Sequence, residues 1–538
     1  MRQPELRIYL DEGEACVDGF AGGGGTSTGI EWAIGRSPDI AINHNREALA
    51  MHKANHPDAE HTLTDIREVS PSDALRGRRC AFAWFSPDCT YFSKAKGGQP
   101  FRDPEHARRI RGLIGVALKW AALPRPQRPR VIFIENVEEI EGWCPLGPDG
   151  KPDPTKYGAS FQRWLGRLRA LGFAVEWRRL RGKDFGAPTT RQRLYIIARS
   201  DGQPIVWPVS THGPALRPYR TAAECMDFDL PVPSIFLTPT EAKAWGQAHG
   251  LPSPKRPLAE ATLRRIARGI HRFVLETGDP FIVNVRHAGG DRVYPLTEPL
   301  RTIPASDREV ALVAPTLIKY HGGQARAHDL RDPIRTLDTS NRFGLVAAFL
   351  AKHNGGHEAT GQRLERPVDT ITTCDQKALV TSHLLKLRGG LTDHVVTGQD
   401  LRVPAPTLTA GGTHLAEVRA FLVKYYGNEK DGRSLLKPID TIVTKDRFAL
   451  VTVMIAGEPY VVVDIGMRML TPRELFTAQG FPDDYEIQTG VDVETGAAVR
   501  FTKKAQTRLV GNSVVPHVAA AIISANLGVQ GWRSERIA

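Results

Sequence analysis

The stretch CVDGFAGGGGT, residues 16–26, decides how the first part of the chain folds. Its first residues predict a short strand, and its run of glycines predicts a turn that leads into a helix. A glycine turn between a strand and a helix lets the backbone approach a bound nucleotide closely. The turn does not end in the Lys-Ser or Lys-Thr of a phosphate loop, so ATP is not favoured. Because glycine turns are common, the stretch alone does not establish a nucleotide site.

Strand and helix patterns alternate around this stretch up to about residue 200, which predicts an α/β fold with a parallel sheet. Residues 104–122 have apolar side chains at helical spacing. Compact apolar runs typical of buried strands occur at 81–85, 131–134 and 194–198. The alternation returns after about residue 463. The sequence therefore predicts one α/β core in two parts, residues 1–202 and 463–538.

The insert between these parts, residues 203–462, has two sections of different character. The first is rich in proline and includes a predicted helix at 263–274, in which an apolar stripe lies beside a basic stripe of four arginines. The basic stripe is compatible with a solvated face or with a phosphate-facing helix. The second, residues 281–452, holds five repeats of about 34 residues, each with an apolar strand, a glycine turn and Pro-x-x-Thr. The repeat prolines are Pro299, Pro333, Pro367, Pro404 and Pro438. One unit is too short to bury a core, so we expect a β-rich stack.

The composition limits the classes of protein to which the chain can belong. The 538 residues suffice for two or three domains, and the formal net charge of +12 is compatible with a polyanionic partner such as nucleic acid. None of the six cysteines forms a Cys-x-x-Cys pair, so neither a zinc ribbon nor a disulfide framework is indicated. The start has no apolar signal core, and no apolar run approaches the roughly 18 residues of a membrane span. We therefore expect a cytoplasmic protein that does not enter a membrane.

Four side chains at strand ends are candidates for chemistry. Cys89 follows the strand at 81–85, and Glu135 follows the strand at 131–134, so both should lie at one edge of the sheet. Arg191 and Arg193 open a further strand and share one face. Each has an ordinary alternative, namely a buried structural cysteine, a helix-capping turn and surface charge. A thiol and a carboxylate at two ends of one sheet favour the functional interpretation.

The order of these motifs resembles the cytosine-5 DNA methyltransferase family. The resemblance covers residues 14–200 and about 464–526. Its C-terminal part includes Arg468-x-Leu470-Thr471-x-x-Glu474, then Gln479-Gly480-Phe481-Pro482, and finally Gly511-Asn512-Ser513-Val514. The resemblance implies a Rossmann-like methyltransferase core, S-adenosylmethionine as cofactor and double-stranded DNA as partner. The β-rich insert takes the place of the family's target-recognition region.

The resemblance also implies roles. Cys89 matches the nucleophile, Glu135 the acid that engages the cytosine ring, and Arg193 the cation near its carbonyl, with Arg191 beside it. The residues expected to bind the cofactor are Phe20, Ala21, Gly22, Asn43, Asp65, Ile66, Asn512 and Ser513. A thiolate that adds at carbon 6 makes carbon 5 nucleophilic enough to take a methyl group, and cations near the thiol should lower its pKa. Since the base must leave the duplex to be reached, base flipping is implied.

Three positions depart from the family pattern. Asp88 stands between Pro87 and the nucleophile, and an inward-pointing carboxylate there should raise the thiol pKa. Asn43 occupies the place of the acidic residue that binds the cofactor ribose, and Thr189 occupies that of a glutamine. The spacing from Cys89 to Ser93 still matches the family, so we keep the assignment.

Two other functions compete with DNA methylation. An RNA cytosine-5 methyltransferase of the same family would typically carry a Cys-Phe-Thr tripeptide, which this sequence lacks. A catalytically silent DNA-binding protein of the same fold would not need Cys89, Glu135 and Arg193 together. The target sequence, the oligomeric state and a partner restriction endonuclease cannot be read from the sequence.

Overall fold

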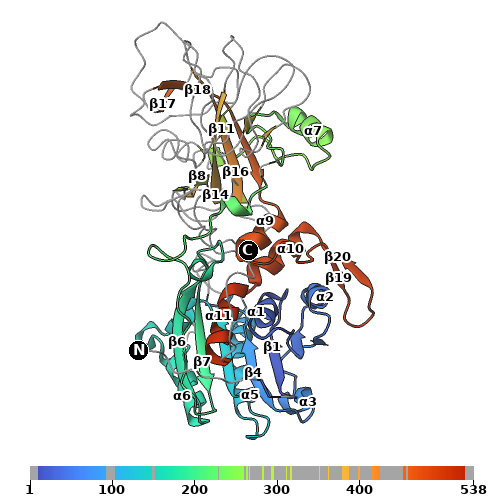
Figure 1. The fold of residues 1–538 in the computed structure, drawn as a ribbon, viewed down its shortest axis with the longest axis vertical. Coiled ribbons are helices and arrows are strands. Elements are labelled where there is room, and N and C mark those ends of the chain that lie inside the picture. The colour runs from blue at the N-terminus through green and yellow to red at the C-terminus, as the bar shows by residue number, and fades with distance from the viewer. Residues whose placement is uncertain are drawn as a thin grey trace. The chain divides into compact units, whose positions relative to one another are not determined.

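The chain forms two compact units in the computed structural model (Figure 1). The first comprises residues 1–219, 406–410 and 475–538, and the second comprises 220–405 and 411–474. The sequence predicted boundaries after residues 202 and 462. The structure describes residues 10–11, 13–92, 103–147, 152–227, 229–259, 262–263, 266 and 465–527, with the backbone of the strands between 281 and 464.

The first unit is built on a seven-stranded sheet in the order β3-β2-β1-β4-β5-β7-β6. The strands are β1 (Ala15–Gly19), β2 (Ile40–Asn43), β3 (Glu60–Leu63), β4 (Cys80–Phe85), β5 (Val131–Asn136), β6 (Ala174–Arg181) and β7 (Gln192–Arg199). The strands from β3 to β5 pair in parallel, and β7 runs antiparallel to both β5 and β6. The predicted α/β fold with a mostly parallel sheet is thus confirmed.

Helices cover both faces of this sheet (Figure 1). They are α1 (Gly25–Ile34), α2 (Arg46–Asn55), α3 (Pro71–Leu75), α4 (Pro104–Gly112), α5 (Val116–Ala121), α6 (Ala159–Ala170), α10 (Lys503–Asn512) and α11 (Pro516–Leu527). The single helix expected at 104–122 is divided by a 3-10 turn at Leu113–Gly115. Two glycines, Gly112 and Gly115, flank the centre of that stretch, and glycine weakens a helix interior.

The core lies on both faces of the sheet because successive side chains of a strand point to opposite sides. In β1, Ala15 and Val17 join one buried cluster with Trp120 and Leu165, whereas Cys16 joins another with residues of α1 and α11. Helices α1 and α11 pack closely, since a Cβ added at Gly29 would lie 2.6 Å from the Cβ of Ala519. The C-terminal segment therefore completes the core of the first unit.

One helical stretch, Lys503–Leu527, is long and apolar enough to cross a membrane by length and composition alone. Within the fold, 83% of its most apolar window is buried. Burial of this kind is typical of a core helix, which agrees with the packing of α11 against α1.

The second unit is rich in strands where its backbone is described. Its main sheet contains β8 (Phe281–Val283), β9 (Val293–Pro295), β10 (Val310–Ala311), β11 (Thr316–Leu317), β14 (Ala378–Lys386), β15 (Gly398–Gln399), β16 (Leu415–Lys424), β17 (Thr452–Ile455) and β18 (Glu458–Met469), while β12 (Leu350–Ala351) pairs with β13 (Gly361–Gln362). Helix α7 (Pro239–Ala248) begins with a capping box of Thr238 and Glu241. The stacking of the five repeats and most of the basic stripe at 263–274 lie outside the described residues.

Two short elements lead from the second unit back to the first. Helix α9 (Pro472–Gln479) spans the boundary, and the hairpin of β19 (Thr489–Val491) and β20 (Ala498–Arg500) belongs to the first unit. Within the second unit, Arg468 forms a buried ion pair with Glu474 at 2.8 Å. The resemblance placed these two residues in one motif, and in the structure they contact each other directly.

Candidate active site

The carboxyl edge of the sheet brings together the four predicted catalytic residues. Cys89 lies on the loop that follows β4, and Glu135 lies near the end of β5. Because β7 runs antiparallel to β5, the start of β7 meets the end of β5, and Arg193 reaches Glu135 with Nε 3.3 Å from Oε1. The side chains of Arg193 and Glu135 are only 11% and 9% exposed. The antiparallel direction of β7 therefore brings Arg193 to Glu135.

Two contacts fix the loop that carries Cys89. The amide of Asn136 donates to the Pro87 carbonyl at 2.9 Å, which ties the loop to β5. On the other side of Cys89, Tyr91 accepts a hydrogen bond of 2.8 Å from Arg111 and lies under its guanidinium. The sequence analysis assigned no role to Asn136 or Arg111. No local pattern marked Arg111, because it lies on α4, far along the chain from its partners.

Burial dominates the electrostatics of the thiol. It raises the pKa of Cys89 from 9.0 to about 11, although the neighbouring Arg193 and Arg191 act to lower it. Glu135 and Asp88 add to the increase. The two arginines act to lower the thiol pKa, as expected, but they do not offset the loss of solvent and the two carboxylates, so the pKa of Cys89 is raised.

Glu135 and Arg191 are also perturbed mainly by burial. Burial raises the pKa of Glu135 above 4.5 against the opposing effect of Arg193 and Arg191. Burial, followed by repulsion from Arg193, lowers the pKa of Arg191 to about 9. Arg191 donates to the Gly511 carbonyl at 3.1 Å, so it joins the catalytic edge to the last motif. Such strongly shifted groups gathered at one sheet edge are typical of a reactive site.

Two of the departures from the family pattern have a structural explanation. Asp88 is exposed, and its Oδ1 accepts a hydrogen bond of 2.6 Å from the Thr90 backbone. The carboxylate therefore stabilises the turn at residues 88–90, which contains Cys89. Thr189 is fully buried, and its hydroxyl accepts from the Arg191 backbone at 3.2 Å. Both residues shape the backbone beside the catalytic side chains. Ser93, the end of the matched spacing, lies outside the described residues.

The glycine turn has the backbone that close approach to a ligand requires. Phe20 has a φ of 67°, which is rare for a non-glycine residue, and Gly22 and Gly24 have φ values of 55° and 94°. A Cβ added at Gly19 would lie 2.5 Å from Phe85 and 2.7 Å from the Ile66 side chain. Gly19, where β1 enters the turn, thus packs against the end of β4 and against Ile66, and its carbonyl accepts from the Ser86 backbone at 3.3 Å, at the start of the loop of Cys89.

The other predicted cofactor residues surround this turn. The Asn43 side-chain oxygen accepts from the Asn45 backbone at 2.8 Å, which leaves its amide hydrogens as the available donors. Asp65 accepts from Arg67 at 3.0 Å, and these hydrogen bonds lower the pKa of its carboxyl to about 2. Asp65 therefore stays ionised and can accept from an amino group. Ala21 is buried, and its backbone donates to the Ile42 carbonyl at 3.1 Å.

The last motif folds onto the glycine turn. A Cβ added at Gly25 would lie 2.4 Å from the Val514 carbonyl and 3.2 Å from the Ser513 Cβ. Gln479 donates to the Ser513 carbonyl at 2.8 Å, which links the preceding motif to the same place. Asn512 is exposed beside the buried Ser513. Segments from both ends of the chain thus form one site next to Cys89 and Glu135.

Comparison with known proteins points to one family. The family described as C-5 cytosine-specific DNA methylase matches residues 15–239 and 372–527. The Type II methyltransferase M.NgoBI of Neisseria gonorrhoeae is 28% identical over 225 residues, which are 42% of this chain and 61% of that protein. The Type II methyltransferase M.AgeI of Thalassovita gelatinovora is 28% identical over 239 residues, which are 40% of this chain and 50% of that protein. The matches thus span between half and two thirds of these relatives.

A methyltransferase of Entamoeba histolytica aligns with 96% of this chain and 98% of its own, at 13% identity and a TM-score of 0.39.

Proposed function

The chain belongs to the C-5 cytosine-specific DNA methylase family, and on that basis we propose that it methylates carbon 5 of cytosine in double-stranded DNA. The observation that carries the proposal is that the buried Glu135–Arg193 pair acts electrostatically on Cys89, at the carboxyl edge of the sheet where the glycine turn begins. A thiol, an acid and a cation are the three groups that activation of a cytosine ring needs.

S-adenosylmethionine, the methyl donor of this family, fits the residues around the turn. The left-handed Phe20 and Gly22 leave the backbone open to a ligand, and Asp65 stays ionised to accept from an adenine amino group. Asn43 would donate to a ribose oxygen, and Asn512 and Ser513 would close the site. The bound cofactor would supply an electrophilic methyl group.

Within the chain, one proton transfer prepares both catalytic groups. The pKa values of Cys89 and Glu135 are both raised by burial, so the pair keeps one proton over a wide pH range. Transfer of the thiol proton to Glu135 creates the nucleophile and the acid together, with no change in net charge. The Cys89 sulfur then bonds to carbon 6, while Glu135 gives its proton to ring nitrogen 3.

Arg193 stabilises the electron density that builds on the ring carbonyl oxygen. The addition would leave an electron pair on carbon 5 that can take an electrophilic methyl group from a bound cofactor. Loss of the carbon-5 proton to solvent, with return of the nitrogen 3 proton to Glu135, would then break the bond between carbon 6 and sulfur, release the Cys89 thiolate and restore the aromatic ring. The base must stand outside the duplex for Cys89 to reach it, so base flipping belongs to the proposal.

The second unit is our candidate for recognition of a target sequence. It contributes none of the matched catalytic residues, and the whole chain carries a net charge of +12. The Type II names of both relatives support a restriction-modification setting with a partner endonuclease.

The test is transfer of a labelled methyl group to DNA, with detection of 5-methylcytosine. Cys89→Ser should abolish transfer but keep cofactor binding, because the described contacts of the glycine turn do not involve the thiol. Cys225→Ser, which changes a buried thiol in the second unit, serves as the matched control. DNA with a fluorine at carbon 5 should trap the wild-type protein covalently, since the proton to be removed is absent. Full turnover by Cys89→Ser would refute the mechanism.

A further inference from the structure

Strand β6 ends at the same edge of the sheet as the catalytic residues. It runs in the direction of β5, because both strands pair antiparallel with β7. Its last residue, Arg181, is exposed and pairs with Gln192, whereas Leu180 pairs with Arg193. Paired strands lie about 5 Å apart. Arg181 therefore lies on the strand next to Arg193, one residue beyond it toward the carboxyl edge.

The alternation of side chains separates Arg181 from the reacting groups. Residues that pair across two strands lie on the same face of a sheet, and successive residues of a strand lie on opposite faces. Arg181 and Gln192 thus share one face, and Arg193 lies on the other. Arg181 flanks the catalytic pair and does not compete with Arg193 for the ring carbonyl.

Hydrogen bonds hold the Arg181 guanidinium in one orientation. Its Nε donates to Oε1 of Gln192 at 2.6 Å, and the amide of Gln192 donates in turn to the Glu138 carboxylate. Among the residues that the structure describes, no group accepts from the two terminal nitrogens of Arg181. Two such nitrogens form the fork that binds two oxygens of one phosphate. The side chain is thus oriented through Nε and keeps its fork for a ligand.

Arg179, two residues earlier on the same face of β6, is by contrast a paired arginine. Its Nε donates to Glu141 at 2.8 Å, and it contacts Glu138 at 3.4 Å. Arg181 forms no ion pair in the described part of the chain, although both arginines are exposed. Direct contacts therefore compensate the charge of Arg179 and leave that of Arg181.

One half-buried carboxylate, that of Asp184, acts on Arg181 without forming an ion pair with it. Burial raises the pKa of Asp184, and Lys183 and Arg181 both act to lower it. Asp184 accepts a hydrogen bond from Tyr219, and Nζ of Lys183 lies 4.0 Å from the centre of the Tyr219 ring. Two cations thus share a single carboxylate at the end of β6, and the local charge stays positive.

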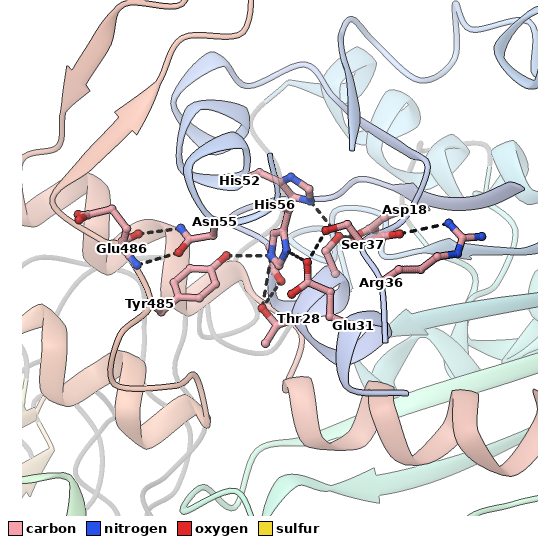
Figure 2. A network of polar contacts seen from close by, with 12 residues as sticks. Asp18, Thr28, Glu31, Arg36, Ser37, His52, Asn55, His56, Tyr485 and Glu486 are labelled. Atoms are coloured by element: carbon pink, nitrogen blue, oxygen red, sulfur yellow. Dashed lines mark hydrogen bonds and ion pairs between the residues drawn. The ribbon is translucent and has the colours of Figure 1, made fainter. Parts of the chain in front are cut away.

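Compensation by direct contact is common among the exposed arginines of the first unit. Arg36, at one end of the polar network in Figure 2, pairs with Asp39 at 2.8 Å. Arg46 of α2 lies 2.5 Å from Asp492. These arginines have an acidic partner in the fold, which Arg181 at the catalytic edge lacks among the described residues.

We propose that Arg181 binds a phosphate of the DNA backbone beside the target cytosine. The inference rests on the proposed function, because that function places the duplex at the catalytic edge. A base that leaves the duplex to reach Cys89 brings its own strand to this edge. Duplex DNA carries one negative charge per about 1.7 Å of its axis, so an uncompensated cation there meets a phosphate. Such a contact fixes the position of the duplex without reading its sequence.

The experiment measures binding of the full-length protein to a fluorescent DNA duplex at a series of salt concentrations. A duplex of any sequence serves, since phosphate contacts do not depend on sequence. Arg181→Gln should weaken binding about tenfold at low salt, as expected for one contact between charged groups. It should also reduce the slope of log affinity against log salt concentration by about 0.9. Arg181→Lys keeps the charge and should keep the wild-type slope.

Arg179→Gln is the matched control. It removes the same charge from the same face of β6, so it changes the long-range attraction of DNA equally. Because the Arg179 guanidinium already contacts Glu141 and Glu138, the slope should remain that of the wild-type protein. Both substitutions are at exposed side chains, and an unchanged Tm verifies that each variant is folded.

The outcomes separate the inference from the proposed function. A wild-type slope for Arg181→Gln, or an equal reduction by Arg179→Gln, would overturn the inference alone. A wild-type protein that binds the duplex but transfers no methyl group to DNA would overturn the proposed function, while the slopes still decide whether Arg181 contacts a phosphate. A wild-type protein that does not bind the duplex would overturn both.

Discussion

Substitution of Glu135 by glutamine should change two properties of the site in opposite directions. Glutamine cannot supply a proton to the ring, and general acid catalysis contributes about 100-fold to 10,000-fold. Methyl transfer should therefore fall by at least about 100-fold. The same substitution removes a negative charge that raises the pKa of Cys89. The thiol should thus become more acidic while the enzyme becomes slower.

The size of the second effect follows from Coulomb's law. At an effective dielectric constant of about 20, a unit charge within roughly 10 Å contributes about 1.7 kcal/mol or more, which is at least a little over one pKa unit. Because the pKa of Cys89 is about 11, its thiolate fraction near neutral pH rises about tenfold per unit. A less basic thiolate is somewhat less nucleophilic, so alkylation should be about threefold to tenfold faster.

The assay compares the rate of labelled methyl transfer with the rate at which iodoacetamide alkylates Cys89, followed by peptide mass analysis. Glu138→Gln removes the same charge on the same edge of the sheet, where Glu138 contacts Arg179 at 3.4 Å, and serves as the control. Slower methylation with faster alkylation supports the assignment. If both rates fall together, Glu135 only supports the fold; if methylation is unchanged, Glu135 is not the acid.

Three further predictions concern the catalytic pair, the glycine turn and the repeats. The rate of methyl transfer at saturating substrates should not rise tenfold per pH unit below the pKa of about 11 of Cys89, because Glu135 takes up the thiol proton; such a rise would show that the free thiolate limits the rate. Gly24→Ala should abolish S-adenosylmethionine binding in a calorimetric titration because its Cβ meets Tyr485, whereas Gly35→Ala, with a similar φ but open space, should only lower the Tm; equal binding by both would contradict the role of the turn. Replacing four repeat lysines with glutamine should make DNA binding less dependent on salt, by about one logarithmic unit per lost phosphate contact, without changing cofactor affinity; an unchanged slope would leave the repeats as scaffold. These lysines are Lys319, Lys352, Lys386 and Lys424.

The position of Cys89 was predictable from the sequence, whereas its pKa was not. The position of Cys89 after a buried apolar run placed it at the carboxyl edge of a parallel sheet, and the structure has it there. Its pKa was not predictable, because it depends on how much solvent the surrounding chain removes and on charges from two other segments, β5 and β7. Arg111, which fixes Tyr91 near the thiol, carried no local signal either.

The amino-acid sequence by itself determined the alternation of strands and helices, the glycine turn and the strand ends that carry Cys89 and Glu135. These features depend on periodicity and composition over a few residues, which any segment displays without reference to the rest of the chain. Only the tertiary structure decided that β7 runs antiparallel and so brings Arg193 to Glu135, and that Tyr485 meets His56 across 429 positions of sequence. Such contacts depend on the packing of elements far apart in the chain, where burial and the need to pair every polar group select the partners.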